Sequence, residues 1–228
     1  MKLLTISNPK TQKSIPQGYL TAVLHLAPFD LSGYQTCPMA EHAGCVAGCL
    51  NKAGRGGIIK KGESTNVIQL ARINRTVRFF EEREQFMIDL HRDIEKAIKL
   101  ANSMGTRLAI RLNGTSDIGW EKIRHLGHRN IMEAFPGIQF YDYTKIEGSS
   151  TPDNYHLTLS RGKHTQTVKH QFNMAVVFRD HLPAYWQGRP VIDGDNSDLR
   201  FLDPDGVIVG LKAKGPAKKD YSGFVVEA

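Results

Sequence analysis

All three cysteines of the chain lie within one short segment that is rich in alanine and glycine. They are Cys37, Cys45 and Cys49, in the spacing C-x7-C-x3-C. Cysteine thiolates hold the irons of iron–sulfur clusters, and small neighbouring residues let backbone amides hydrogen-bond the cluster sulfurs. Three thiolates can hold three irons of a [4Fe–4S] cube and leave the fourth iron open. The spacing therefore predicts an iron–sulfur cluster, with redox or radical-type chemistry on a small molecule bound at the open iron or in a nearby pocket.

Two other interpretations of the cysteines stay open. Zinc could bind the thiolates together with His42, which would make the protein a zinc-stapled interaction module. His42 lies between two of the cysteines, however, and no C-x2-C pair of the zinc-finger kind is present. Alternatively the three thiols are reduced and unligated, since free cysteine is often simply buried.

The basic residues are unevenly distributed. The chain carries 30 Lys and Arg against 23 Asp and Glu, a formal net charge of +7. Residues 52–83 are rich in basic side chains and poor in acidic ones, and such a segment attracts phosphate. Arg72, Arg75 and Arg78 would then contact phosphates, in a nucleic-acid-associated protein whose cluster is structural or redox-sensing. The simpler interpretation is a solvated helical face.

Length and composition exclude several classes of protein. A chain of 228 residues can bury a sizeable core without staples. No apolar stretch is long enough to span a membrane, and the N-terminus lacks the pattern of a signal peptide. Three cysteines in such a chain are not a disulfide framework. We expect a soluble, cytoplasmic protein without a membrane partner; the sequence leaves open its oligomeric state and whether it is an enzyme.

The cysteines fall in a long predicted loop, residues 29–64, which follows an apolar strand at 19–28. A loop of this length inside a compact domain is usually functional. Strands then alternate with helices, which predicts an α/β fold whose mainly parallel sheet is curled into a partial TIM-like barrel. The chain, residues 1–228, is expected to be a single domain that ends in a small β-rich segment at 190–228. The other expected elements are helices at 66–84 (apolar stripe Val67, Leu70, Ile73, Val77 and Phe80), 83–103, 119–134 and 164–174, and strands at 107–112, 138–144, 154–161, 174–179, 190–193, 199–202 and 207–211.

Polar side chains follow several of these strands. Ligands of parallel α/β folds collect at the carboxyl ends of the strands. The candidate pocket residues are therefore His25, Asn113, Asp117 and Asp142, with His42 from the loop. Plainer roles are open to them, because Asn and Asp side chains often cap helices and a histidine in an apolar strand is often a core residue. A further acidic group could bind a divalent cation, although turn chemistry is the simpler account; it comprises Asp193, Asp195, Asp198, Asp203 and Asp205.

Short motifs spread over most of the chain carry a family resemblance. They are Leu20–Pro28, Leu31–Tyr34, Cys37–Ala40, Gly44–Cys45, Cys49–Leu50, Ala53–Gly56, Arg111–Asp117, Tyr141–Lys145, Asp193–Asp195, Asp198–Pro204 and Gly206–Leu211. On these motifs the chain resembles the Gene 88 protein family of tailed bacteriophages. The resemblance implies a phage origin, and hence a protein of the infected host's cytoplasm, but it implies no activity and no catalytic residues.

A looser resemblance is to radical S-adenosylmethionine enzymes. They place a three-cysteine [4Fe–4S] loop after the first strand of a partial TIM barrel, which is where this loop is predicted to lie. The resemblance implies S-adenosylmethionine or another small molecule at the open iron. The chain departs from that pattern, because those enzymes use the spacing C-x3-C-x2-C and a Gly-Gly-Glu-Pro-like segment that this sequence lacks.

Overall fold

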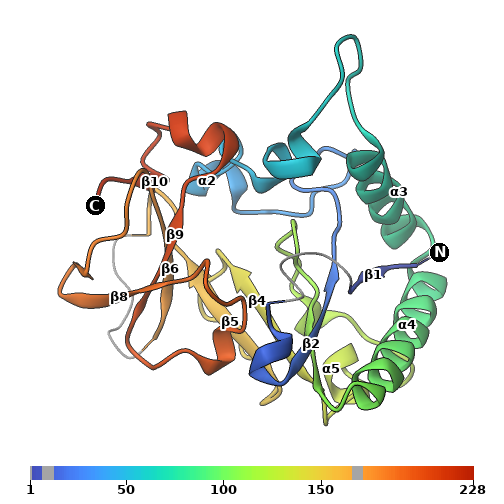
Figure 1. The fold of residues 1–228 in the computed structure, drawn as a ribbon. Coiled ribbons are helices and arrows are strands. Elements are labelled where there is room, and N and C mark those ends of the chain that lie inside the picture. The colour runs from blue at the N-terminus through green and yellow to red at the C-terminus, as the bar shows by residue number, and fades with distance from the viewer. Residues whose placement is uncertain (1, 7–12, 166–171) are drawn as a thin grey trace.

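The computed structural model describes residues 2–6, 13–165 and 172–228 and shows a mixed α/β architecture (Figure 1). Within these residues, ten strands form one sheet in the order β1-β2-β3-β4-β5-β6-β9-β8-β7, and β10 pairs with β6 beside this path. All neighbours from β2 to β8 along that order are parallel, whereas β1 and β7 run antiparallel to their neighbours. Because β1 and β7 end the row, the described sheet is open. The strands are β1 Leu4–Thr5, β2 Tyr19–Leu24, β3 Arg107–Arg111, β4 Gln139–Thr144, β5 Tyr155–Ser160, β6 Met174–Phe178, β7 Tyr185–Trp186, β8 Arg189–Asp193, β9 Ile208–Lys212 and β10 Val225–Val226.

The two long helices of the described chain both lie in the connection between β2 and β3. They are α3 (Val67–Glu81) and α4 (Arg83–Ser103), which run along one side of the sheet (Figure 1). No helix among the described residues is long and apolar enough to cross a membrane. The remaining helical segments are short: η1 Ile15–Gln17, α2 Ala40–Ala43, η2 Leu50–Lys52, η3 Gly54–Gly57, η4 Trp120–Lys122, α5 Ile131–Ala134, η5 Arg200–Leu202 and η6 Gly215–Lys219.

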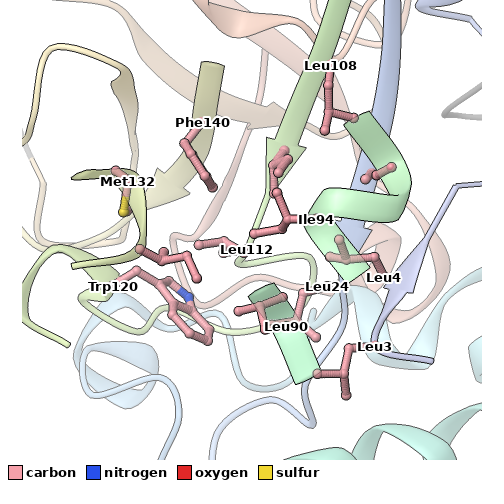
Figure 2. Close-up of a cluster of buried hydrophobic side chains, with 14 of the residues drawn as sticks. Leu3, Leu4, Leu24, Leu90, Ile94, Leu108, Leu112, Trp120, Met132 and Phe140 are labelled. Carbon is pink, nitrogen blue, oxygen red and sulfur yellow. The ribbon is translucent and has the colours of Figure 1, made fainter. Parts of the chain in front are cut away.

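The largest hydrophobic core lies between α4 and the sheet (Figure 2). Phe86, Leu90 and Ile94 of α4 are fully buried in it, and their spacing of four residues places them on one face of the helix. Leu24 and Ile110, from β2 and β3, are buried in the same core. Burying one such side chain stabilises a fold by roughly 1.5–3 kcal/mol. The apolar spacing therefore predicts α4 correctly.

Helix α3 is turned the other way from its predicted orientation. Val67 and Leu70, which the apolar stripe places in the core, are 81% and 47% exposed, while Phe80 does pack against the core. The buried side of α3 carries Gln69 and Thr76 over its first turns and Phe79, which belongs to the core, near its end. The amide of Gln69 donates to backbone carbonyl oxygens of η2 and η3, so this part of α3 lies on the polar backbone of the cysteine-bearing loop rather than on the apolar sheet.

Two other predicted elements differ from the structure, and a third is largely untested. Residues 119–134 form the short segments η4 and α5 rather than one helix, because Leu126 and Gly127 have positive φ values of 44° and 82°, which a right-handed helix does not allow. The predicted strand at 199–202 is the helical turn η5, where Arg200 pairs with Asp203. The predicted helix at 164–174 falls mostly outside the described residues. Strands of the β-rich segment 190–228 are part of the main sheet.

A histidine pair with one buried member, His125, is expected to make the fold sensitive to acid. Nδ1 of His91 on α4 lies 2.9 Å from Nε2 of His125, and burial, with a smaller effect of His91, lowers the pKa of His125 to about 4. The unfolded chain therefore takes up this proton first as the pH falls from 6.5 to 4, so the free energy of unfolding decreases across that window and is fully restored above it. Burial lowers the pKa of His25 to about 3 with the same sign. We expect the urea midpoint of His125→Asn to change less between pH 7 and pH 5 than that of the wild type; an unchanged pH dependence would contradict this role.

Candidate functional site

The cysteine-bearing loop, residues 29–64, crosses the carboxyl ends of the parallel strands, at the top of the sheet in Figure 1. The carbonyl oxygen of Thr36 accepts from the backbone N–H of Asp117, after β3, at 2.9 Å. The carbonyl oxygen of Ala43 accepts from the N–H of Lys163, after β5, also at 2.9 Å. The loop is thus attached to the edge where ligands of parallel sheets collect, as the sequence predicts.

The three cysteine thiols all lie on this loop, and over the described ranges they are not placed as a group that holds a metal ion. All are free and partly buried, and Cys49 is within electrostatic range of both Cys37 and Cys45. Cys45 also packs against a small hydrophobic cluster at the C-terminal end of the chain that includes Phe224. The backbone N–H of Asn51 points at Sγ of Cys49 at 3.5 Å.

Burial raises the pKa of each thiol. The pKa of Cys37 is raised to about 11, and those of Cys45 and Cys49 are raised as well. Without a bound ligand the thiols are therefore protonated at neutral pH. A metal that binds thiolates would displace these protons, so loading becomes more favourable as the pH rises.

Positive side chains surround the thiols. Lys145, directly after β4, is in electrostatic range of Cys37 and Cys45, and it donates to Oγ of Ser160 at 2.8 Å. Burial lowers the pKa of Lys145, which the neighbouring thiols oppose. On the other side Arg72 of α3 is in electrostatic range of Cys49. These cations favour negative charge at the thiols.

The inward side of α3 holds the loop and orients its arginines. Arg72 donates to Oδ1 of Asn51 at 2.5 Å, which links it to the residue whose N–H faces Cys49. Arg75 donates to the carbonyl oxygen of His25 at 2.8 Å. Arg78 instead pairs with Asp89 at 2.6 Å and Glu82 at 3.2 Å. The three arginines predicted as phosphate contacts therefore do not share one free face.

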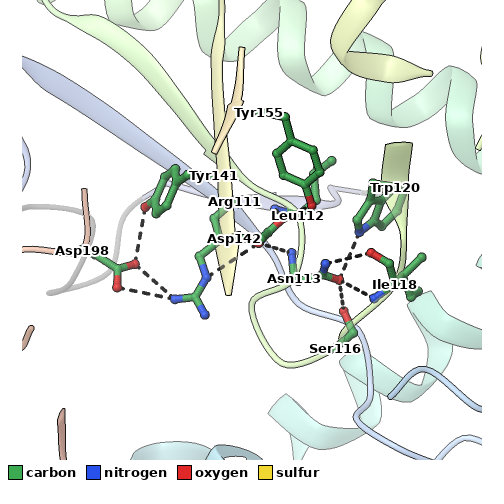
Figure 3. Close-up of polar contacts among 10 residues, drawn as sticks. All are labelled: Arg111, Leu112, Asn113, Ser116, Ile118, Trp120, Tyr141, Asp142, Tyr155 and Asp198. Atoms are coloured by element: carbon green, nitrogen blue, oxygen red, sulfur yellow. Dashed lines mark hydrogen bonds and ion pairs between the residues drawn. The ribbon is translucent and has the colours of Figure 1, made fainter. Parts of the chain in front are cut away.

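Two of the predicted pocket residues have structural contacts (Figure 3). Asp142 is fully buried and accepts from the N–H groups of Leu112 and Asn113 and from the hydroxyl of Tyr155, with Arg111 at 3.8 Å. Oδ1 of Asn113 accepts from three donors and its amide donates to Ile118, so it organises the turn after β3. The three donors are Ser116 Oγ, Ile118 N and Trp120 Nε1.

The other predicted residues divide between the site and the surface. Asp117 is in electrostatic range of Lys145 and Cys37, and its carboxylate accepts from the N–H of Lys145 at 2.8 Å. His25 is close to Arg72 and buried. His42 is exposed, with its ring 4.2 Å from that of His164. Sequence reasoning missed Lys145, which the strand-end rule would have found because it directly follows β4.

The acidic group near the C-terminus is spread over several contacts. Asp198 pairs with Arg111 at 3.2 Å, and Asp195 pairs with Lys214. The carboxylate of Asp193 accepts from the N–H of Asp195, which is turn chemistry. Over the described ranges no group of three or more His, Cys, Asp or Glu side chains is placed to hold a metal ion.

Fold and site together define a mixed α/β protein in which a three-cysteine loop and buried cations meet at the carboxyl edge of a mostly parallel, open sheet. The chain belongs to the Gene product 88 family, the bacteriophage family that its motifs resemble, because the family model matches residues 2–228. No curated protein and no solved structure matches the chain. The comparisons lend no support to the looser resemblance to radical S-adenosylmethionine enzymes.

Proposed function

We propose that this protein is an iron–sulfur protein in which Cys37, Cys45 and Cys49 hold a [4Fe–4S] cluster. The observation that carries the proposal is that all three cysteines lie on one loop at the ligand-binding edge of the sheet, with Lys145 in electrostatic range of Cys37 and Cys45 and Arg72 in range of Cys49. Neutral, purely structural thiols would have no need of cationic neighbours.

The donor set and its charge fit such a cluster. Thiolate is the usual ligand of iron–sulfur centres, and hydrogen bonds to sulfur and nearby charges tune their potentials. Here the N–H of Asn51 faces Cys49, and Lys145 and Arg72 would offset the negative charge that three thiolates bring. When bound, the cluster would supply electron transfer and, at an iron without a protein ligand, a place for a small molecule.

A four-iron cube and a single zinc ion need different arrangements of their sulfur donors. A cube takes one thiolate at each of three corners, so its donors lie farther apart than the donors of one ion. A single zinc ion needs tetrahedral donors that converge on one point. His42, which would complete a Cys3His site, faces His164 on the surface.

The sheet also supports a partial-barrel interpretation of the site. Strands β2 to β6 follow one another in chain order and all run parallel, which is the order of strands in a TIM-like barrel. We infer that the sheet curls around a ligand region beneath the loop, where Asp117 is in electrostatic range of Cys37. S-adenosylmethionine and small redox-active molecules are the candidates for that region.

Anaerobic purification with metal analysis tests the proposal. The expected preparation is brown, absorbs broadly near ~400 nm, and contains about four irons and four sulfides per chain, the content of one cube. Stoichiometric zinc without iron would replace the proposal with a zinc site. A colourless protein that stays metal-free after anaerobic reconstitution with iron and sulfide would refute it.

The cluster-free protein should have unusually unreactive thiols. The pKa of Cys37 is about 11, against 9.0 for an ordinary thiol, which lowers the thiolate fraction at pH 7 by about 100-fold. The thiolate of a more basic thiol is also more nucleophilic, which raises the rate again by about 10-fold. We expect iodoacetamide to alkylate Cys37 roughly 10-fold more slowly than a free thiol at pH 7, and faster as the pH rises. Peptide mass spectrometry after timed labelling measures this, and alkylation of Cys37 at the rate of free cysteine would contradict the burial.

A further inference from the structure

The outward face of α3 carries an apolar stripe, interrupted by the exposed Asn74, that packs against none of the hydrophobic clusters of the described residues. Val67 is 81% exposed and Leu70 47% exposed. Ile73 and Val77 continue the same side of the helix and are half-buried, but they pack against none of the hydrophobic clusters of the described chain. An apolar stripe of this kind on the surface marks an interaction site.

The N-terminal end of this stripe is basic. The segment that precedes α3 projects from the body of the molecule (Figure 1) and carries Lys60 and Lys61 at its turn, beside Ile58, which is 68% exposed. The base of the projection is fixed, because Nδ2 of Asn66 donates to the carbonyl oxygens of Arg55, Gly56 and Ile58. Oδ1 of Asn66 also caps α3. The projecting segment therefore holds a defined position relative to the helix.

The C-terminal end of the stripe is acidic. Glu81, Glu82 and Glu84 are all exposed at the corner between α3 and α4. They line a surface hollow together with Arg83, Gln85 and Ile88, and Glu82 pairs with Arg78 at 3.2 Å. The 15 residues of α3, which lie between this acidic corner and the basic turn, span about 22 Å at 1.5 Å per residue.

We propose that the outward face of α3 is a dimer interface that binds a second copy of this chain, with the two α3 helices packed antiparallel about a two-fold axis. A two-fold interface brings each end of the patch against the opposite end on its partner. In this pairing the Lys60–Lys61 turn of each copy contacts the acidic corner of the other copy. The two apolar stripes cover each other between these two contacts. Val67 and Leu70 lose their exposure to water.

The pattern of charge favours a second copy over a polyanionic partner. Nucleic acid or an anionic lipid surface would be attracted by Lys60 and Lys61 but repelled by the glutamates at the other end of the same face. The basic turn also holds the exposed Glu63 and the acidic corner also holds Arg83, so each end has an excess of one sign. A partner that presents the opposite excess at both ends, with an apolar strip between them, fits this face, and another copy of this chain does so.

Sedimentation velocity over a tenfold-spaced concentration series tests the interface. The wild type is expected to dimerise, and Leu70→Glu to raise the dimer dissociation constant at least tenfold, since it places a charge in the apolar strip. Leu100→Glu is the matched control, because Leu100 is also an exposed helical leucine but lies on α4; it should leave the dissociation constant unchanged. Circular dichroism checks that each variant is folded.

Charge reversal tests the antiparallel arrangement. Lys60→Glu with Lys61→Glu should weaken the dimer, and so should Glu82→Lys with Glu84→Lys. Combining all four changes in one chain restores opposite charges across the two-fold axis, so dimerisation should recover. Recovery is specific to this arrangement, because every variant with only one end reversed brings like charges together.

Three outcomes would overturn the proposal. The first is a wild-type protein that stays monomeric at every concentration, whether or not it binds RNA or vesicles containing phosphatidylglycerol. Another is a dimer that Leu70→Glu does not weaken. The third is a four-fold charge variant that dimerises no better than either double variant.

Discussion

Cys45→Ala is expected to purify without its cluster. Iron should fall from about four atoms per chain to less than one, and the broad absorption near ~400 nm should disappear, because two thiolates cannot retain a cube that three hold. Cys45 also packs against the C-terminal cluster around Phe224, so the loop around it should loosen as well. Iron and sulfide analysis of anaerobically purified protein measures the loss, and circular dichroism shows whether the rest of the fold persists.

His42→Ala is the control that separates iron from zinc. His42 is exposed and faces His164, so a cube held by three cysteines should keep its full iron content in this variant. A Cys3His zinc site would lose metal instead. If Cys45→Ala kept its colour and iron, or if His42→Ala lost as much metal as Cys45→Ala, the assignment of the ligands would be wrong.

Asp142→Ala is expected to destabilise the protein by about 4 kcal/mol. The change leaves the buried N–H groups of Leu112 and Asn113 and the hydroxyl of Tyr155 without their acceptor, and it removes a counter-charge of the buried Arg111. Unsatisfied buried donors cost roughly 1–3 kcal/mol each, and a broken buried pair costs about 3–5 kcal/mol. Urea unfolding should show the loss, with a melting temperature lower by roughly 10 °C.

Asp153→Ala is the matched control for that experiment, since Asp153 is exposed and surface changes alter stability by less than about 0.5 kcal/mol. The comparison also separates a structural role of Asp142 from a role in ligand binding. If the Asp142→Ala protein were as stable as the wild type and only lost a bound small molecule, Asp142 would have a role in ligand binding, which would contradict the structural role described here.

The sequence predicts the strands well because their signal is local. Apolar runs mark the longer strands, such as β2, β3 and β6, whereas the two-residue strands β1, β7 and β10 carry no such run and are not predicted. Helix α4 has an apolar face that fits the core directly. Helix α3 shows that apolar periodicity does not tell which neighbour an apolar face packs against. Its spacing identifies an apolar face correctly, but which neighbour covers that face depends on tertiary contacts, and here the polar backbone of the cysteine-bearing loop takes the inner side.

The candidate site was predictable in position more than in detail. The strand-end rule locates the correct edge of the sheet, and the clustered cysteines locate the loop above it. The rule does not say which way a side chain points. In β4, Asp142 faces the hydrogen-bond donors of the turn after β3, whereas Lys145, just beyond the strand, reaches the thiols. Contacts such as Arg72 with Asn51 depend on the fold of the loop, which carries no periodic signal.

The most direct test of the central claim is an anomalous difference map at the iron absorption edge, from a crystal grown without oxygen. The account predicts one strong peak, the size of a compact four-iron group, bounded by Sγ of Cys37, Cys45 and Cys49 and with Lys145 nearby. A map without iron at these three sulfur atoms, from protein that had been reconstituted with iron and sulfide, would contradict it.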